Sequence, residues 1–323
     1  MIFVAGSANL DFVVRAPRIP APGETVLGRD FKTFPGGKGA NQAVACARAG
    51  GMATAMLLAL GDDPYAALIE NSLADAGVTM HKVRAAGQPT GCAFICVSDD
   101  AENAITVAPG ANSCLRAEHL PPLQGFTHLL LQLEIPMETV SAYASSARAQ
   151  GVCVMLNAAP AQAISPQLLE QLDILVVNEA ELATIAEPQT GISQCLASLA
   201  VPCVVVTLGA RGCVARLDGK FYTQPGFAVQ AVDTTAAGDT FCGVLAAALS
   251  AGSGMQDALI QACAAGALTC TQAGAQESIP SVDELQAFLH SAPAGSAEQH
   301  AALRRSCDIT DPLLSCAAEP GTA

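Results

Sequence analysis

A run of small residues ends in a carboxylate directly before a long aliphatic stretch, in the sequence Asp233-Thr234-Thr235-Ala236-Ala237-Gly238-Asp239. Small side chains leave backbone N–H groups open, and at the start of a helix such donors bind anions with the help of the helix dipole. Asp239 is also of a residue type preferred as a helix N-cap, so a structural cap and a proton acceptor for phosphoryl transfer both stay possible. The run indicates a phosphate site with Asp239 as a candidate general base.

A second glycine-rich element, Gly36-Gly37-Lys38-Gly39-Ala40-Asn41, precedes another helical pattern. It is not a Walker A loop, because Lys38 is followed by Gly39 rather than by Ser or Thr. The glycines allow either a tight turn into the helix or a surface on which a ligand lies against the backbone. In the second case Lys38 and Asn41 supply polar contacts.

A third element places Asn178 and Glu181 directly after the apolar run Ile174 to Val177. Residues three apart share one face of a helical turn. A carboxylate at this place could hold the water shell of Mg²⁺, an ion that keeps several waters and few protein ligands. A solvated helix start, with acidic residues favoured by the helix dipole, explains the pattern equally well.

The elements that must position these residues alternate between short apolar runs and helical patterns, which predicts an α/β fold with a doubly wound, mostly parallel sheet covered by helices on both faces. Predicted strands are Ile2 to Ala5, Thr54 to Leu60, Leu129 to Leu133, Val152 to Leu156, Ile174 to Val177 and Val204 to Leu208. Predicted helices are Gly39 to Ala49, Tyr65 to Ala76, Met137 to Ala149, Gln194 to Ala200, Asp239 to Ser250, Gln256 to Thr269 and Val282 to His290.

Two stretches interrupt this alternation. Residues 12–34 and 90–107 are β-like, contain Pro and Gly, and have no helix between their short strands. They predict a small separate sheet that could act as a lid over the ligand-binding edge of the main sheet. The residues from 291 to 323 lack a clear period and are expected to form a loosely ordered tail.

Composition excludes several classes of protein. The 323 residues are 51% hydrophobic and 14% charged, and 15 basic against 29 acidic residues give a net charge of −14, which disfavours nucleic acids and anionic membranes as partners. No apolar run is long enough to span a bilayer, and the N-terminus has no basic flank, so a cytoplasmic protein is expected. The 13 cysteines are odd in number, scattered and without a CxxC pair, which favours buried thiols.

Taken together, these residues resemble the ribokinase-like carbohydrate kinases of the PfkB type. The resemblance runs from about Val4 to His290, so residues 1–290 are expected to form one kinase domain. It includes both glycine motifs, with Asn178 to Glu181 and Thr207 to Gly212 in the expected order between them.

The resemblance implies a role for each matching position. The implied sugar contacts are Asn9, Asp11, Gly37, Lys38, Asn41 and Glu134. Asp239 is the implied base, beside an anion hole made by the backbone of Ala236, Ala237 and Gly238. The implied nucleotide site comprises Asn178, Thr207, Leu208, Gly209, Ala210, Arg211, Gly212, Gly238 and Cys263, and Glu181 is the acidic residue near Mg²⁺, acting through water.

Members of this family are activated by a monovalent cation, usually K⁺, beside the anion hole. The matching positions are Asp233, Thr235, Thr269, Gln272, Gly274 and Ser278, and a buried Asp233 would be costly without a counter-ion. Two positions depart from the family pattern: Cys263 stands where a His is expected near the adenine, and Glu277 replaces a Pro in the cation loop. The resemblance further implies a homodimer that pairs through the lid, whose open strand edges invite association.

The activity implied is ATP-dependent phosphorylation of D-ribose at its 5-hydroxyl. A kinase of the same fold for 2-deoxyribose, another pentose or a nucleoside stays open, as does a catalytically silent sugar sensor, although the intact Asp239 run argues against the sensor. A dehydrogenase is weaker still, because no G-x-G-x-x-G follows the first strand.

Overall fold

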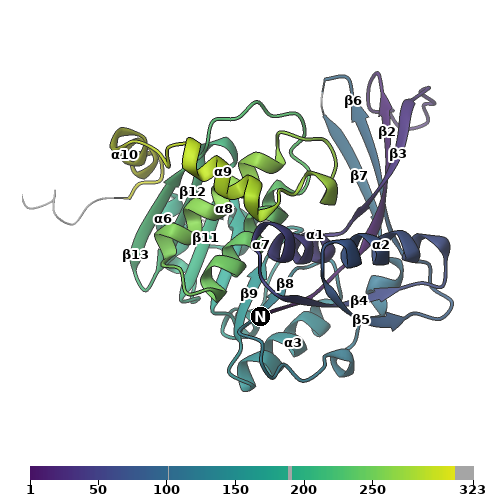
Figure 1. Ribbon diagram of the computed structural model, residues 1–323, viewed down its shortest axis with the longest axis horizontal. Helices are drawn as coiled ribbons and strands as arrows, with labels where there is room; N and C mark the ends of the chain where they lie inside the picture. The colour runs from purple at the N-terminus through teal and green to yellow at the C-terminus, as the bar shows by residue number, and fades with distance from the viewer. Residues whose placement is uncertain (101, 188–190, 310–323) are drawn as a thin grey trace, which may run out of the picture.

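The main body of the protein is a large sheet between two layers of helices. The computed structural model describes residues 1–100, 102–187 and 191–309, and in this part of the chain nine strands form the main sheet, in the order β13-β12-β11-β10-β9-β8-β1-β4-β5 (Figure 1). The strands are β1 (Ile2–Ala5), β4 (Thr54–Leu60), β5 (Thr79–Arg84), β8 (His128–Leu131), β9 (Cys153–Asn157), β10 (Ile174–Asn178), β11 (Cys203–Thr207), β12 (Gly212–Leu217) and β13 (Lys220–Pro225). Neighbours from β5 to β11 pair in parallel, whereas β12 and β13 are antiparallel.

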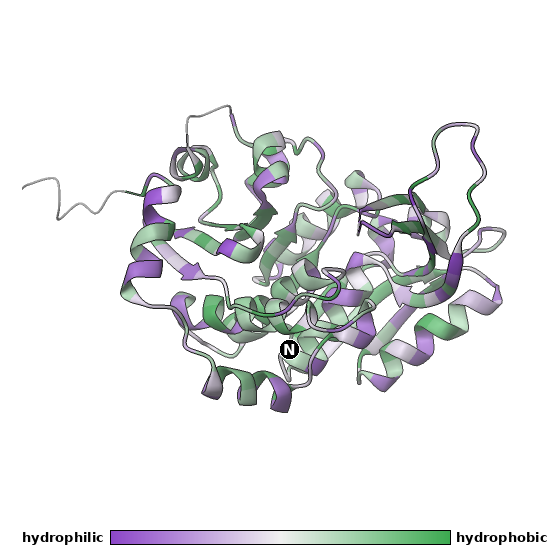
Figure 2. Ribbon diagram, turned by 90° about the horizontal axis from the view of Figure 1, so that it is seen from above, coloured by the Kyte–Doolittle hydropathy of each residue, from purple (hydrophilic) through white to green (hydrophobic). Residues whose placement is uncertain are grey.

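The central strands are continuous apolar runs because both of their faces are covered, as is typical of parallel sheets. Ile2 and Val4 of β1 point into one hydrophobic core, and Phe3 and Ala5 point into the other. Figure 2 shows hydrophobic residues along the inner strands and on the helices that pack against them. Each core therefore holds one layer of helices on the sheet.

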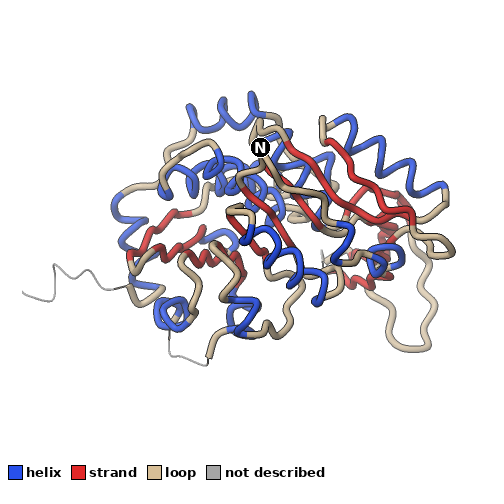
Figure 3. Tube along the Cα trace, turned by 90° about the horizontal axis from the view of Figure 1, so that it is seen from below, coloured by secondary structure: helices blue, strands red, loops and turns tan. Residues whose placement is uncertain are grey.

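One layer consists of α1 (Lys38–Val44), α2 (Pro64–Asp75), α7 (Ala237–Ser250), α8 (Met255–Thr269) and α9 (Val282–Ser291), and α1 continues into a π-helical turn, η1 (Ala45–Ala49). The opposite layer consists of α3 (Met137–Ala149), α4 (Pro166–Leu169), α5 (Glu179–Ile185), α6 (Ile192–Ser198) and α10 (Ala297–Ser306). Short 3₁₀ turns are η2 (Gly110–Cys114), η3 (Ala117–His119), η4 (Gly209–Arg211) and η5 (Gln276–Ser278). Figure 3 shows the strands lying between these layers.

A second, smaller sheet projects from one side of the main body (Figure 1). Its strands are β2 (Asn9–Ala16), β3 (Arg29–Gly36), β6 (Gly91–Ser98) and β7 (Asn103–Ala108), in the order β3-β2-β6-β7. Strand β2 follows β1 directly, so the first residues of this sheet lie at the carboxyl edge of the main sheet. The separate sheet predicted from residues 12–34 and 90–107 is confirmed.

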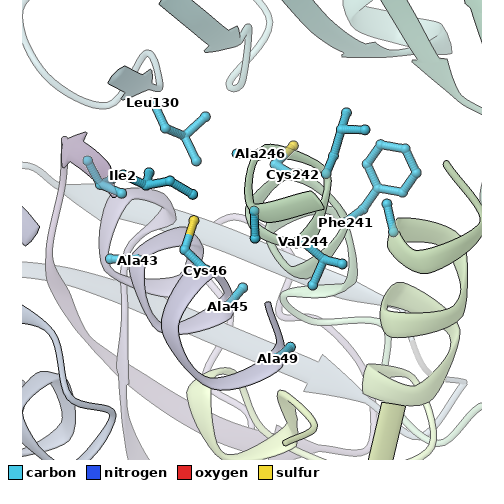
Figure 4. Close-up of a cluster of buried hydrophobic side chains, with 14 of the residues drawn as sticks. Ile2, Ala43, Ala45, Cys46, Ala49, Leu130, Phe241, Cys242, Val244 and Ala246 are labelled. Atoms are coloured by element: carbon cyan, nitrogen blue, oxygen red, sulfur yellow. The ribbon is translucent and has the colours of Figure 1, made fainter. Parts of the chain in front are cut away.

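Helices α1 and α7 approach each other closely because small residues line both. A Cβ atom at Gly243 would lie 2.5 Å from Cβ of Ala45 and 2.7 Å from the Gln42 carbonyl oxygen. The Cys46 thiol donates to the Gly243 carbonyl at 3.3 Å. The side chains of this contact, among them Ala45, Cys46 and Cys242, form one apolar cluster (Figure 4). This contact holds the start of α1 beside the start of α7.

The predicted α/β class, the two-sided helix cover and the bounds of β1, β4 and α3 are confirmed. Strands β5, β12 and β13 and helices α4, α5 and α10 were not predicted. The structure also differs from the expected loose tail: α10 packs against β13 and buries Leu303, because its amphipathic face covers the end of the sheet. The rest of the predicted tail, residues 310–323, lies outside the described residues.

Among the helices described, none has the length and apolar character to cross a membrane.

Replacing Gly243 by Val should force α1 and α7 apart. Overpacking of this kind costs about 1 to 3 kcal/mol, so urea unfolding should show a lower free energy of unfolding by that amount. Gly254→Ala is the matched control, because a Cβ there meets no atom within 4 Å. Equal losses in the two variants would contradict the tight α1–α7 contact.

Candidate active site

A cleft of about 210 Å³ opens where the carboxyl ends of β9, β10 and β11 face the start of α7. Its lining residues are Lys38, Asn157, Ala159, Val176, Val177, Asn178, Glu181, Thr207, Thr234, Ala236, Gly238, Asp239 and Cys242. The cleft joins three elements that the sequence singled out separately: the two glycine motifs and the segment after β10. In open α/β sheets this edge is where ligands bind.

The Asp239 carboxylate lies in the first turn of α7 and is buried. Its Oδ2 accepts a hydrogen bond from Nδ2 of Asn41 at 2.9 Å, and its Oδ1 accepts one from Nε2 of Gln42 at 2.9 Å. Both donors come from α1, which the Gly243 contact holds in place. Asp239 is therefore not the N-cap that its residue type also allowed, since Ala236 occupies the cap position.

The turn before α7 presents backbone donors to the cleft. Ala236 adopts a left-handed conformation (φ 60°), which costs a non-glycine residue about 1 kcal/mol and is often found at functional sites. The first N–H groups of a helix have no acceptor within the helix. Of the three expected anion-hole donors, Ala237 N–H already donates to the Thr234 carbonyl, at 3.3 Å. Ala236 and Gly238 line the cleft itself.

Lys38 brings a positive charge to the same cleft. Burial lowers the pKa of its ammonium group, but the carboxylates of Asp239, Glu134 and Glu181 act against burial, and the net pKa is raised. The lysine is consequently charged and compensates the acidic groups around it. Gly37, at a φ of 87°, allows the backbone to turn into α1, where a Cβ would lie 2.8 Å from the Asn9 nitrogen.

Asn9 and Asp11, at the base of the small sheet, are buried next to this charge cluster. Asn9 Oδ1 accepts from Nδ2 of Asn112 at 2.7 Å. Burial, followed by the nearby carboxylates of Glu134 and Asp239, raises the pKa of Asp11 from its ordinary value of 3.8 to about 7. Gly36 leaves room for this carboxylate, because a Cβ there would lie 2.2 Å from Asp11 Oδ2.

Glu134 connects the second glycine motif to the end of β1. Its Oε2 accepts from the Ser7 hydroxyl at 2.6 Å and from the Lys38 backbone N–H at 3.0 Å. Ser7 in turn accepts from the Gly39 N–H at 3.2 Å. The expected sugar contacts Asp11, Lys38, Asn41 and Glu134 are thus gathered around Asp239, as their hydrogen bonds and mutual charges show, and Asn9 lies two residues before Asp11 on β2.

The segment after β10 forms a reciprocal capping box at the start of α5. Glu181 N–H donates to Asn178 Oδ1, and Asn178 N–H donates to Glu181 Oε2, both at 2.8 Å. The start of α5 is solvated at Asn178 and Glu179, as the structural alternative predicted, whereas Glu181 is buried and lines the cleft. Burial raises the pKa of Glu181, partly offset by its hydrogen bond to Asn178 and by Lys38.

Of the other expected nucleotide residues, Thr207 lines the cleft. Leu208, Gly209, Ala210, Arg211 and Gly212 form the adjoining turn η4 and its flanks, outside the cleft lining. Arg211 pairs with Glu179 on the surface. Cys263 is buried on α8, where its sulfur lies 3.4 Å from that of Cys213, and it does not line the cleft. Its contact with an adenine ring stays a prediction.

The expected cation positions are brought together only in part. Asp233 Oδ1 accepts from the N–H and hydroxyl of Thr235, and its Oδ2 accepts from Gly274 N–H at 3.1 Å. Ser278 donates to the carbonyls of Gly274 and Ala275.

Two details differ from expectation. Asp233 is half-buried and already accepts these hydrogen bonds, so its burial does not demand a counter-ion. The Thr269 hydroxyl donates hydrogen bonds to the Thr240 hydroxyl and to the Ala265 carbonyl. The Gln272 side chain is exposed. In the described part of the chain, no group of three or more His, Cys, Asp or Glu side chains is placed to hold a metal ion.

Several buried polar residues without a predicted role complete the site. They are Ser7, Gln42, Asn112, Gln132, Asn157 and Gln276, each hydrogen-bonded to a site residue or to another member of this set. The one signal available was an isolated amide within an apolar run, as at Gln132 between Leu131 and Leu133. Buried polar side chains need partners, so such a residue points to a polar site nearby.

Comparison with known proteins defines the class. Residues 1–282 match the model of the pfkB family carbohydrate kinases. The chain therefore belongs to this family.

Within the family, the chain groups with the ribokinases. It is 39% identical to a ribokinase of Haemophilus influenzae over 90% of this chain and 98% of that protein. The crystal structure of a Thermotoga maritima ribokinase superposes with a TM-score of 0.82 at 37% identity, covering 90% of this chain and 99% of that one. The structure of an Arabidopsis thaliana ribokinase complexed with ribose and ATP superposes with a TM-score of 0.81 at 34% identity, covering 89% and 98%.

The pKa of Asp11 predicts a pH-dependent stability. Between pH 3.8 and about 7 the folded protein keeps a proton that the unfolded chain releases, so stability falls as pH rises through this window. Asp11→Asn removes the penalty and should raise the Tm at pH 8 by about 2 °C or more, with a smaller gain at pH 5. Thermal unfolding at the two pH values checks this, with the exposed Asp62→Asn as control. A gain that is the same at both values would contradict it.

Proposed function

We propose that the protein transfers the γ-phosphate of ATP to the 5-hydroxyl of D-ribose, giving D-ribose 5-phosphate and ADP. The observation that carries this proposal is the Asp239 carboxylate, fixed by two amide donors at the start of α7 and set between a sugar-type polar cluster and an anion-binding turn. The ribose and ATP in the Arabidopsis thaliana relative support the choice of substrates.

In this reaction Asp239 accepts the proton of the primary hydroxyl as the oxygen attacks phosphorus in line. The hydroxyls of the sugar find acceptors in the buried Asp11 and the half-buried Glu134 and a donor in the buried Asn41 amide. The backbone N–H groups of Ala236 and Gly238, which line the cleft, are the proposed donors to the charge that spreads over the equatorial oxygens of the transferred group. Closure of the small sheet over the sugar would exclude water that could otherwise hydrolyse ATP.

The negative charge of the cleft favours binding of the nucleotide together with a divalent cation. The cleft holds the carboxylates of Asp239 and Glu181 against one ammonium, Lys38, so a triphosphate would enter a site that is already acidic. Mg²⁺ prefers oxygen ligands and keeps several waters, and Glu181 lines the cleft where it could hold such a water. When bound, Mg²⁺ would neutralise part of the negative charge of the triphosphate.

The loops at Asp233 and Gly274 offer a donor set suited to K⁺. A carboxylate, two hydroxyls and backbone carbonyls are hard oxygen donors, and the Gly274–Asp233 hydrogen bond holds the two loops together. We place the monovalent cation there, with Thr269 and Gln272 contributing backbone oxygens only.

The small sheet supplies a surface for a homodimer. Ile105 and Val107 are 55% and 41% exposed and, by strand register, lie on the same face of the sheet as Asp11. Pairing of two such faces would cover them and close both sugar sites.

Because the reaction consumes ATP, we place the protein in the cytoplasm, where ATP is made available.

A kinase for 2-deoxyribose, another pentose or a nucleoside would use the same Asp239 chemistry with a different sugar pocket. Asn9 and Asp11 favour a ligand with vicinal hydroxyls, since both are buried polar side chains two residues apart on β2. A silent sensor would have no need of a carboxylate fixed at the start of α7.

Asp239→Asn is expected to lower kcat by at least about 100-fold, because loss of a general base costs about 10²- to 10⁴-fold. Ribose affinity, measured by isothermal titration calorimetry, should stay within a few-fold of the wild-type value. A variant that keeps more than about a hundredth of the wild-type kcat would remove Asp239 from this role.

Exchange of K⁺ for tetramethylammonium should lower kcat about tenfold, equivalent to about 1.4 kcal/mol of transition-state stabilisation. Asp233→Asn should show the same low rate in both salts. The rates are read from a coupled ADP-release assay at constant ionic strength. Equal wild-type rates in the two salts would argue against a cation at this loop.

Ile105→Asp should shift the sedimentation coefficient from that of a dimer to that of a monomer, because it buries a charge in the proposed interface. Leu68→Asp, at a 46% exposed position on α2, is the matched control and should leave the dimer intact. A wild-type protein that sediments as a monomer at all concentrations would exclude the interface.

A further inference from the structure

We infer that Gln42, oriented by Gln132, is a positioning residue for Asp239. This inference rests on the proposed function, in which Asp239 is the base. Gln42 and Gln132 are both fully buried, and neither lines the cleft. They form a chain of amides that runs from Gln132, the residue after β8, through α1 to the reacting carboxylate.

The orientation of the Gln42 amide is fixed by groups that can only accept. Its Nε2 donates to Asp239 Oδ1 at 2.9 Å and to Asn157 Oδ1 at 3.0 Å. Asn157 itself must point its oxygen at Gln42, because its Nδ2 donates to the Val176 carbonyl at 3.3 Å. An amide has two N–H donors and one acceptor oxygen, so both donors of Gln42 are committed.

The remaining oxygen of Gln42 accepts from Nε2 of Gln132 at 2.6 Å. A flip of the Gln42 amide would set its oxygen against Asp239 and Asn157 and its nitrogen against the nitrogen of Gln132. All three contacts would then lose their hydrogen bond. The chain therefore holds one N–H aimed at one Asp239 oxygen, while Asn41 holds the other oxygen.

Gln132 makes this contact at a cost to stability. Its Oε1 is buried and has no hydrogen-bond partner, and it lies so close to Gly6 that a Cβ there would be 2.0 Å away. An apolar residue of similar length would avoid the unpaired oxygen. The hydrogen bond to Gln42 gives a polar residue at this position a role that an apolar residue could not fill.

Two consequences follow for the reaction. With both oxygens held, the carboxylate cannot rotate, so its free lone pairs stay directed at the sugar hydroxyl. Both bonds are also strong ones, since hydrogen bonds to a carboxylate are stronger than those between neutral groups, so the position of the carboxylate depends on them. Loss of the Gln42 donor should lower the rate of phosphoryl transfer and leave substrate binding nearly unchanged.

The test compares Gln42→Met and Gln132→Met with the wild-type protein in single-turnover rapid-quench assays with ATP and D-ribose. Gln42→Met should slow transfer about 10- to 100-fold and Gln132→Met about 3- to 10-fold, because the first removes a bond to a charged group and the second a neutral one. KM for ribose should change less than twofold in both.

Thermal unfolding separates positioning from support of the fold. Gln132→Met removes the unpaired Gln132 oxygen and leaves the Gln42 oxygen unpaired instead, so its Tm should stay close to the wild-type Tm while the rate falls. Tyr143→Phe deletes one buried hydrogen bond, to the Arg116 carbonyl on the far layer of helices, and serves as control: its Tm should fall with no change in rate.

Asp239→Asn in the same assay distinguishes the two proposals. If Asp239→Asn is inactive and both glutamine variants transfer phosphate at the wild-type rate, the role of Gln42 is overturned and the base is kept. If the wild-type protein transfers no phosphate to ribose, the proposed function fails. If Asp239→Asn stays active, Asp239 is not the base, and the inference about Gln42 fails with that role. A fall in Tm without a fall in rate for Gln132→Met would also overturn the inference.

Discussion

The close approach of α1 and α7 is the constraint on which the site depends. The two helices begin with the two glycine-rich motifs, and Gly243 lets them touch, so that Asn41 and Gln42 reach both oxygens of Asp239. A larger residue at the contact would move the donors away from the carboxylate by more than the tolerance of a hydrogen bond. The packing of small apolar residues in the core thus sets the geometry of the polar site.

A second feature is an excess of buried carboxylates. Asp11, Glu181 and Asp239 are buried and Glu134 is half-buried around the ammonium of Lys38. Burial and, after it, the charges of Glu134 and Asp239 raise the pKa of Asp11, which reflects a penalty on its ionised form. In the proposed reaction, the hydroxyls of the bound sugar and the cation bound with the nucleotide would reduce this penalty. Groups that destabilise the free protein and are satisfied by ligands are expected where selection acts on function.

The sequence was informative where local pattern decides structure. Continuous apolar runs predicted β1 and β4, and the two glycine motifs located Asp239 and Lys38. Strand β5 was missed because its exposed edge position carries mixed polar residues such as His81 and Lys82, and α10 because its helical character depends on packing against β13. The roles of Gln42 and Gln132 could not be predicted, since they arise from contacts between residues 90 positions apart.

The central claim is that Asp239 and the surrounding polar cluster serve phosphoryl transfer to D-ribose. The most direct test is a coupled ADP-release assay with Mg-ATP and ribose, 2-deoxyribose, fructose, adenosine and pseudouridine, with the product of the preferred substrate identified by ³¹P and ¹³C NMR. A clear preference for ribose, with phosphate on its 5-oxygen, is the predicted result. Preference for another substrate, or phosphate on another oxygen, would contradict the account.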